Sequence, residues 1–130
     1  MKRKNRANEE LEKLRSLLLE ESEDKETVII VEGRRDYRTL KNLGVNTDKI
    51  ILYSINSKEK LAKILEKSER VIVFTDFDKE GMKIEKEIKN LCQSIGIQFD
   101  VKIKREFFRR LREITGKSIR DVEGILNLYI

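Results

Sequence analysis

Four acidic residues lie where two short aliphatic runs end. Glu32 follows the run TVIIV, whereas Asp76, Asp78 and Glu80 follow the run RVIVFT. Acids two residues apart in extended chain point the same way, because the side-chain period of a strand is two. Negative charges this close raise one another's pKa unless a cation lies among them. The spacing therefore favours a hard divalent cation with oxygen ligands, and Mg²⁺ is the cation that fits best.

Each of these acids also has an ordinary structural explanation. Asp78 directly precedes an expected helix, where aspartate is a common N-cap. Glu80 falls in the first turn of that helix, where the helix dipole favours acids. Glu32 alone is compatible with a solvated strand end. The spacing by itself leaves metal binding and helix capping open as alternatives.

The composition excludes several kinds of chemistry. The 130 residues include no histidine and one cysteine, so histidine bases, an internal disulfide and a multi-cysteine zinc site are all excluded. No run approaches the roughly 20 apolar residues of a membrane span, and the basic N-terminus lacks the apolar segment of a signal peptide. We therefore expect a cytoplasmic protein with no membrane association, whose chemistry uses carboxylates, lysine, arginine, hydroxyls and a hard metal.

The elements that must position the acids alternate between strands and helices. Apolar runs predict strands at 27–32, 49–54 and 70–75, with a fourth, edge strand at 97–103. Amphipathic spacing predicts helices at 7–22, 33–44, 57–67, 79–96 and 105–115, and the S-x-x-D pattern from Ser118 predicts a last helix. This alternation predicts an α/β, Rossmann-like three-layer fold with a four-stranded parallel central sheet, flanked by N- and C-terminal helices.

Such a sheet would bring the acids together. Ligands of parallel α/β sheets bind beyond the carboxyl ends of the strands, where the strand order reverses. If the first and third strands are central neighbours, Glu32 meets Asp76 and Asp78 at that edge. Gly33 and Gly81 are then expected to let the backbone approach a ligand.

Positive charge is concentrated near both ends of the chain. Residues 1–6 carry four cations, and residues 102–120 carry eight cations against two acids. A basic end beside an acidic cluster suggests a polyanionic partner. We expect residues 1–26 to form an N-terminal helix and acidic linker, 27–103 an α/β domain, and 104–130 a basic helical extension packed on the same domain.

The run VIIVEGRRD, followed about 40 residues later by VIVFTDFDKEG, resembles the Toprim domain. This metal-binding module is shared by topoisomerases, bacterial-type primases, the 5S ribosomal RNA maturase and recombination-repair proteins of the RecR type. Its signature is a glutamate after the first strand and D-x-D after the third, and residues 27–103 span the whole module. The resemblance implies that Glu32 is a catalytic acid or base that also touches metal. It further implies that Asp76, Asp78 and Glu80 are metal ligands, with Mn²⁺ as the alternative to Mg²⁺.

Cations around this site are expected to bind a nucleic-acid backbone. The expected substrate-binding residues are Arg34, Arg35, Lys79, Arg105, Arg109 and Arg112. Arg34 and Arg35 suit an exposed helix surface equally well. The sequence has no counterpart of the domain that supplies the topoisomerase tyrosine, nor of the primase zinc domain. The resemblance is therefore to a small stand-alone Toprim protein.

Three functions follow as hypotheses. The leading one is a Mg²⁺-dependent, nuclease-like phosphodiester hydrolase or transferase that acts on RNA or DNA. The alternative is a non-catalytic module that uses metal to bind nucleic-acid phosphate or to act as an adaptor. The third is a partner-binding protein that uses Leu11, Leu14 and Leu18 with Phe107 and Phe108 as assembly surfaces, although such stripes are more often core. The sequence leaves open catalysis by the chain alone, RNA or DNA as substrate, the number of metal ions and the oligomeric state.

Overall fold

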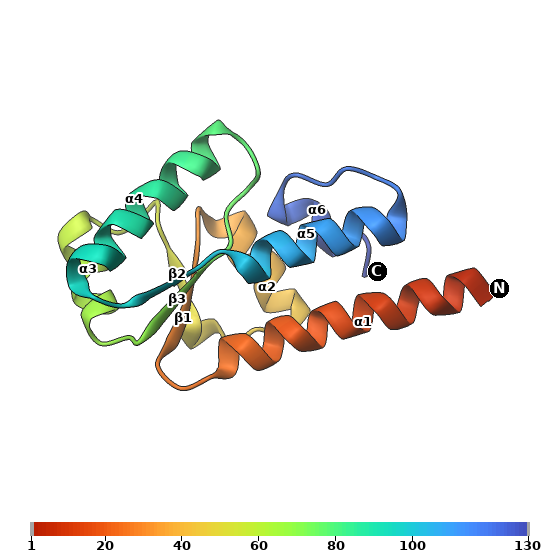
Figure 1. Cartoon of the computed structure of the whole chain (residues 1–130), viewed down its shortest axis with the longest axis horizontal. Coiled ribbons are helices and arrows are strands. Elements are labelled where there is room, and N and C mark those ends of the chain that lie inside the picture. The colour runs from red at the N-terminus through yellow and green to blue at the C-terminus, as the bar shows by residue number, and fades with distance from the viewer. Residues whose placement is uncertain (1, 130) are drawn as a thin grey trace.

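The computed structural model describes the backbone of residues 2–129 and the side chains of residues 7–125 and 127–129. Strands and helices alternate along the chain (Figure 1). The elements are α1 (Lys2–Glu23), β1 (Thr27–Val31), α2 (Arg34–Leu43), the 3₁₀ turn η1 (Thr47–Lys49), β2 (Ile50–Leu52), α3 (Lys58–Glu66), β3 (Arg70–Val73), α4 (Lys79–Ile95), β4 (Gln98–Asp100), α5 (Lys102–Thr115) and α6 (Val122–Leu126).

The four strands form one parallel sheet in the order β2-β1-β3-β4. β1 lies between β2 and β3, and its Ile29 is paired with Ile50 on one side and Ile72 on the other. β4 pairs with β3 at the edge of the sheet. The α/β fold with a four-stranded parallel sheet is thus confirmed, as is the central position of the first and third strands.

Helices cover both faces of the sheet, which gives the molecule three layers (Figure 1). Successive residues of β1 face opposite layers, because side chains alternate along a strand. Ile29 and Val31 pack into the core formed with α1, α2, α5 and α6, whereas Ile30 packs into the core formed with α3 and α4. Burial on both faces explains why these strands are continuous aliphatic runs rather than alternating ones.

Several predicted boundaries differ from the structure, and at two of them an aspartate side chain determines where the helix begins. β4 ends at Asp100 rather than 103, because Asp100 Oδ1 accepts hydrogen bonds from the backbone N–H groups of Lys102 and Ile103 (2.8 and 3.3 Å) and starts α5 there. Ser118 does not cap the last helix. Asp121 is its N-cap and accepts a hydrogen bond from the Gly124 N–H at 2.6 Å.

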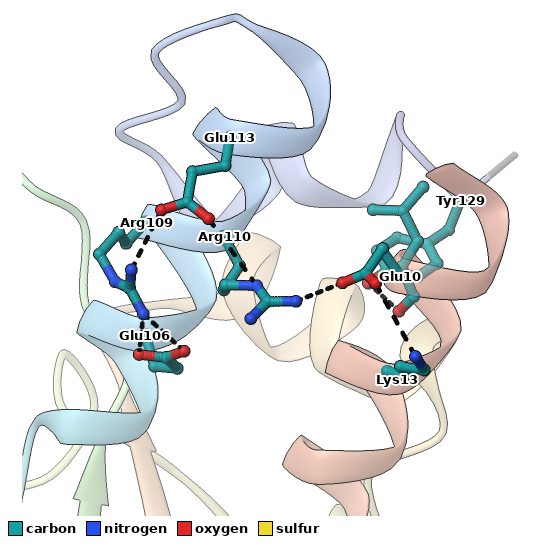
Figure 2. Close-up of polar contacts among 8 residues, drawn as sticks. Glu10, Lys13, Glu106, Arg109, Arg110, Glu113 and Tyr129 are labelled. Atoms are coloured by element: carbon teal, nitrogen blue, oxygen red, sulfur yellow. Dashed lines mark hydrogen bonds and ion pairs between the residues drawn. The ribbon is translucent and has the colours of Figure 1, made fainter. Parts of the chain in front are cut away.

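The N-terminal helix and the C-terminal segment pack on each other as well as on the sheet. α1 and α5 run side by side over one face (Figure 1). The Tyr129 hydroxyl donates to the backbone oxygen of Leu11 at 2.7 Å, and Arg110 forms an ion pair with Glu10 (Figure 2). Every helix of residues 2–129 is too short or too polar to span a bilayer.

Candidate metal centre

The predicted acids lie at the carboxyl ends of the two central strands. Glu32 directly follows β1, and Asp76 and Asp78 follow the neighbouring, parallel β3. Burial raises the pKa of Glu32, and the negative charges of Asp76, Asp36, Asp78 and Glu80 raise it further. The acids of the two strands therefore share one electrostatic environment at this edge of the sheet.

Asp76 is held in place from the C-terminal segment. Its Oδ1 accepts a hydrogen bond from the Val122 N–H at 2.8 Å, at the start of α6. Burial raises the pKa of Asp76, the Val122 hydrogen bond opposes that rise, and the charge of Asp78 adds to it. Within the described chain, Asp76 Oδ2 has no hydrogen-bond partner, so this oxygen is available to a cation.

Asp78 and Glu80 belong to the start of α4. Asp78 is exposed and caps the helix, since its Oδ1 accepts a hydrogen bond from the Gly81 N–H at 2.7 Å. Glu80 lies exposed in the first turn of the same helix. The capping explanation for Asp78 is therefore correct. It does not exclude metal binding, because a carboxylate has a second oxygen.

Gly81 is required by the protein's own backbone. A Cβ built on Gly81 would lie 2.0 Å from the backbone oxygen of Asp76, a distance that no side chain can occupy. The Thr75 hydroxyl also donates to the Gly81 carbonyl at 3.2 Å. A Cβ on Gly33 would meet only Ser54 Oγ, at an ordinary 3.8 Å. Gly81 thus allows a close approach of the Asp76 backbone, whereas the approach of a ligand at Gly33 and Gly81 stays a prediction.

Asp36 is an acid of this region that the sequence analysis did not single out. It is buried in α2, and its Oδ2 accepts a hydrogen bond from the Gly33 N–H at 3.2 Å. Burial raises the pKa of Asp36 to about 6, and the Asp76 charge contributes to that rise. Its position three residues after Gly33 is the sequence signal, because an acid there can bond back to the start of a helix.

Lys104 is the second residue that was missed. Its side chain is 1% exposed, and its Nζ lies 3.0 Å from Thr75 Oγ1 and 3.2 Å from Glu85 Oε1. The ammonium also lies 4.6 Å from the centre of the Phe77 ring. Burial lowers the pKa of Lys104, and Glu85 opposes that shift. This cation therefore contacts the Thr75–Asp78 loop at Thr75 and Phe77, and its charge lowers the pKa of Asp76.

The predicted substrate-binding cations lie in three places. Arg34 and Arg35 begin α2 and Lys79 begins α4, and all three are exposed. The others lie on α5, namely Arg105, Arg109 and Arg112. Arg109 already forms ion pairs with Glu106 at 2.7 Å and Glu113 at 3.0 Å (Figure 2). The substrate-binding role of all six stays a prediction.

The acids do not form a closed cage. Among the residues that the structure describes, no three acidic or cysteine side chains come close enough to surround one ion. Mg²⁺ suits such an open arrangement, because it keeps several waters and usually takes one or two carboxylates together with substrate phosphate. Asp76 and Asp78 fit that donor set. Each has one oxygen fixed by a backbone N–H and a second carboxylate oxygen to offer.

The comparisons with known proteins agree with this fold. The Toprim domain family matches residues 27–110. A UPF0292 protein of Thermococcus gammatolerans is 34% identical over 113 residues, which cover 87% of this chain and 81% of that protein. A UPF0292 protein of Methanosarcina acetivorans is 37% identical over 120 residues, which cover 88% and 78%. A solved structure of a protein from Aquifex aeolicus has a TM-score of 0.72 at 27% identity, and the match covers 87% and 95%.

The chain belongs to the Toprim family. Its relatives include archaeal UPF0292 proteins, which it matches over most of their length. Toprim domains are metal-binding modules of nucleic-acid-related proteins and generally bind divalent ions. The predicted family is thus confirmed, together with its fold.

Proposed function

We propose that this protein is a Mg²⁺-dependent, nuclease-like enzyme that acts on the phosphodiester bonds of nucleic acid. The observation that supports it most is that Glu32 and the pair Asp76 and Asp78 follow two neighbouring parallel strands and so lie at one edge of the sheet, where the aspartates raise the pKa of Glu32. Family membership supports the same chemistry, because Toprim domains bind divalent ions.

Each acid has a role that its surroundings favour. Asp76 and Asp78 would hold the cation, since backbone N–H groups of Val122 and Gly81 fix one oxygen of each. A bound Mg²⁺ supplies polarisation of the phosphoryl oxygen and stabilises the charge that develops there. Burial and neighbouring charges raise the pKa of Glu32, which brings its proton affinity closer to neutral pH, where acid-base catalysis works best.

Glu32 would manage the proton of the reaction. As the oxygen of a water molecule bonds to phosphorus, the Glu32 carboxylate takes the proton of that water. The bond between phosphorus and the leaving sugar oxygen breaks, and this oxygen then takes a proton from Glu32 or from solvent. Both oxygen atoms and the proton are accounted for without any further co-reactant.

The test is cleavage of end-labelled single-stranded and duplex RNA and DNA in millimolar MgCl₂, MnCl₂ or EDTA. Glu32→Gln and Asp76→Asn should each lower the rate by about 100-fold or more, because each removes a charged group from the reacting centre. Glu66→Gln, on the exposed end of α3, is the matched control and should cleave like the wild type. Equal cleavage by all variants would contradict the proposal.

A second candidate function is metal-dependent binding without cleavage. The open arrangement of the acids favours it, because an ion held by few protein ligands can bridge to phosphate without turnover. Binding that requires Mg²⁺ and weakens steeply with salt, while the substrate stays intact, would support this candidate.

A further inference from the structure

A groove with a basic wall lies between α2 and the end of β2. It has a volume of about 360 Å³ and is lined by Arg34, Tyr37, Arg38, Lys41, Leu52 and Ile55, and we call it the α2 groove. Its three cations are four and three residues apart on α2, so they follow one side of that helix. The opposite wall is the chain that leaves the end of β2.

The cations of the α2 groove are not neutralised by neighbouring acids. Among the side chains that the structure describes, no carboxylate forms an ion pair with Arg34, Arg38 or Lys41. Arg109 and Arg110 of α5 differ, since they form ion pairs with acids of α5 and α1 (Figure 2). A row of uncompensated positive charge attracts a polyanion, and the α2 groove presents such a row.

One wall of the α2 groove continues from a segment that is hydrogen-bonded to the backbone of Glu32. The segment after β2 that forms one wall runs beside β1, where the Tyr53 N–H donates to the Val31 oxygen at 2.8 Å and the Ser54 N–H to the Glu32 oxygen at 2.9 Å. Arg34 lies two residues after Glu32 at the start of α2. A chain of phosphates bound along α2 would therefore arrive at the acids of the sheet edge.

Apolar side chains lie among the cations of the α2 groove. Tyr37 and Leu52 are partly buried, whereas Ile55 is 61% exposed. Tyr37 and Leu52 also pack against the core, so only part of each side chain faces the groove. A duplex keeps its bases stacked inside and offers no base to these exposed parts or to Ile55. A single strand can place an unstacked base against an aromatic ring while its phosphates contact the cations. The combination of charge and apolar surface thus favours a single strand.

We infer that the α2 groove binds a single-stranded stretch of nucleic acid and directs it toward Glu32. Phosphates contact Arg34, Arg38 and Lys41, and one base lies against Tyr37 and Ile55. The part of the inference that directs the strand toward Glu32 rests on the proposed function, whereas the binding of the strand does not depend on metal.

The test is fluorescence anisotropy of short labelled single strands of DNA and of RNA, with a duplex of equal length for comparison, all in EDTA. The double variant Arg38→Glu/Lys41→Glu should weaken single-strand binding by about 10-fold or more. It should also reduce the slope of log affinity against log salt by about 1.4, or 0.7 for each lost phosphate contact. The control Lys86→Glu/Lys89→Glu makes the same charge change on exposed positions of α4 and should bind like the wild type.

A second pair of variants tests the base contact. Tyr37→Ala should weaken single-strand binding by about 5-fold or more, whereas Tyr37→Phe, which keeps the ring, should bind normally. Far-ultraviolet circular dichroism of each variant identifies any loss that comes from unfolding. Binding of the duplex as tightly as the single strand, or an equal loss in the α4 control, would overturn the inference.

Failure of the inference can be told apart from failure of the proposed function. If wild-type protein binds single strands through the α2 groove but cleaves nothing in any metal, the proposed function fails and the inference stands. If Glu32→Gln abolishes cleavage while Arg38→Glu/Lys41→Glu binds and cleaves like the wild type, the inference fails and the proposed function stands.

Discussion

At the scale of single residues, Gly81 is the position with the least freedom near the candidate metal centre. We predict that Gly81→Ala destabilises the protein by about 2–4 kcal/mol, because its Cβ would lie 2.0 Å from the Asp76 oxygen and must push that backbone away. Urea denaturation measures the loss. Gly33→Ala is the control and should cost less than about 1 kcal/mol, since its Cβ makes an ordinary contact at 3.8 Å. Equal losses would contradict the assignment.

Asp36 leads to a prediction about pH. Burial raises its pKa to about 6 in the folded protein, so between about pH 4 and 6 the folded state holds the proton that the unfolded state releases. The contribution of Asp36 to stability therefore falls as the pH rises through this range. Asp36→Asn should be more stable than the wild type by about 1–2 kcal/mol near pH 8 in EDTA, and equally stable near pH 4.

The measurement for Asp36 is chemical denaturation of both proteins at several pH values. Asparagine keeps an oxygen that can accept the Gly33 hydrogen bond, so the comparison isolates the charge. The same stability difference at every pH would show that the Asp36 charge is not responsible.

Lys104 is expected to contribute through both packing and charge. We predict that Lys104→Ala loses about 2–4 kcal/mol, because it leaves a buried cavity and removes a hydrogen-bond partner from Thr75 and from Glu85. Lys104→Met fills the same volume and should lose clearly less. Urea denaturation in EDTA distinguishes them, and an equal loss in both would show that the ammonium contacts alone matter.

The sequence did not identify Lys104 and Asp36 as buried residues, and the reasons are physical. Lys104 stands in a basic run, yet it is three, four and seven residues before Phe107, Phe108 and Leu111 and so shares their buried side of α5. The charge of Lys104 predicts an exposed side chain, whereas its spacing to these apolar residues correctly indicates a buried one. Asp36 lies among arginines at the start of an expected helix. Its position three residues after Gly33 indicates a hydrogen bond back to the helix start, but it does not show that the side chain is buried.

At the scale of elements, Asp100 joins three of them. Its Oδ2 pairs with Arg70 of β3 at 2.6 Å, and its Oδ1 caps α5 from the end of β4. We predict that Asp100→Ala costs about 3–4 kcal/mol, because it removes a helix cap and leaves a partly buried arginine with Glu21 alone. Thermal denaturation should show the loss. Asp48→Ala on the exposed turn η1 should change little, and similar losses would contradict this account.

The sequence predicted well the strands of the sheet and the helices that cover it. Each strand is buried on both faces, whereas each helix is buried on one side only. Those two kinds of burial leave different patterns in the sequence, as in TVIIV at 27–31 and the spaced apolar residues of 79–95. The errors lie where a side chain competes with the pattern, since Asp100 ends β4 early and Asp121 rather than Ser118 starts α6.

The packing between elements was less predictable than the elements themselves. The apolar stripe of α1 predicted that one side of this helix is buried, but not which other element packs against that side. The structure places Leu14 and Leu18 of that stripe and Phe107 of α5 in one core, with 4%, 0% and 0% of each residue exposed. These residues are therefore core rather than an assembly surface. Likewise, no pattern in the sequence shows that Val122 of α6 bonds to Asp76.

At the scale of the whole molecule, the segment with the most cations in the sequence is not where the folded protein has its row of unpaired positive charge. Much of the basic character of α5 is used internally, since Arg109 and Arg110 pair with nearby acids (Figure 2). The three cations of the α2 groove contribute less to the count but have no such partners among the described side chains. Uncompensated charge, rather than the density of charge in the sequence, is what attracts a polyanion.

The stabilisation of the folded protein by magnesium should depend on pH. Metal binding requires ionised carboxylates, and the pKa values of Glu32 and Asp76 are both raised in the folded protein. Protons therefore compete with the cation more strongly at low pH. We predict that millimolar MgCl₂ raises the free energy of unfolding by about 1.4 kcal/mol when present at ten times its dissociation constant near pH 8, and by clearly less near pH 5.

The measurement is the melting temperature of the wild type and of Asp76→Asn, with MgCl₂ and with EDTA, at both pH values. Asp76→Asn should show no effect of magnesium at either pH, because it removes the carboxylate whose Oδ2 faces no other partner within the described chain. KCl at equal ionic strength controls for screening of the surface charges. A magnesium effect that is the same at both pH values, or that persists in Asp76→Asn, would place the ion somewhere other than the edge where β1 and β3 end.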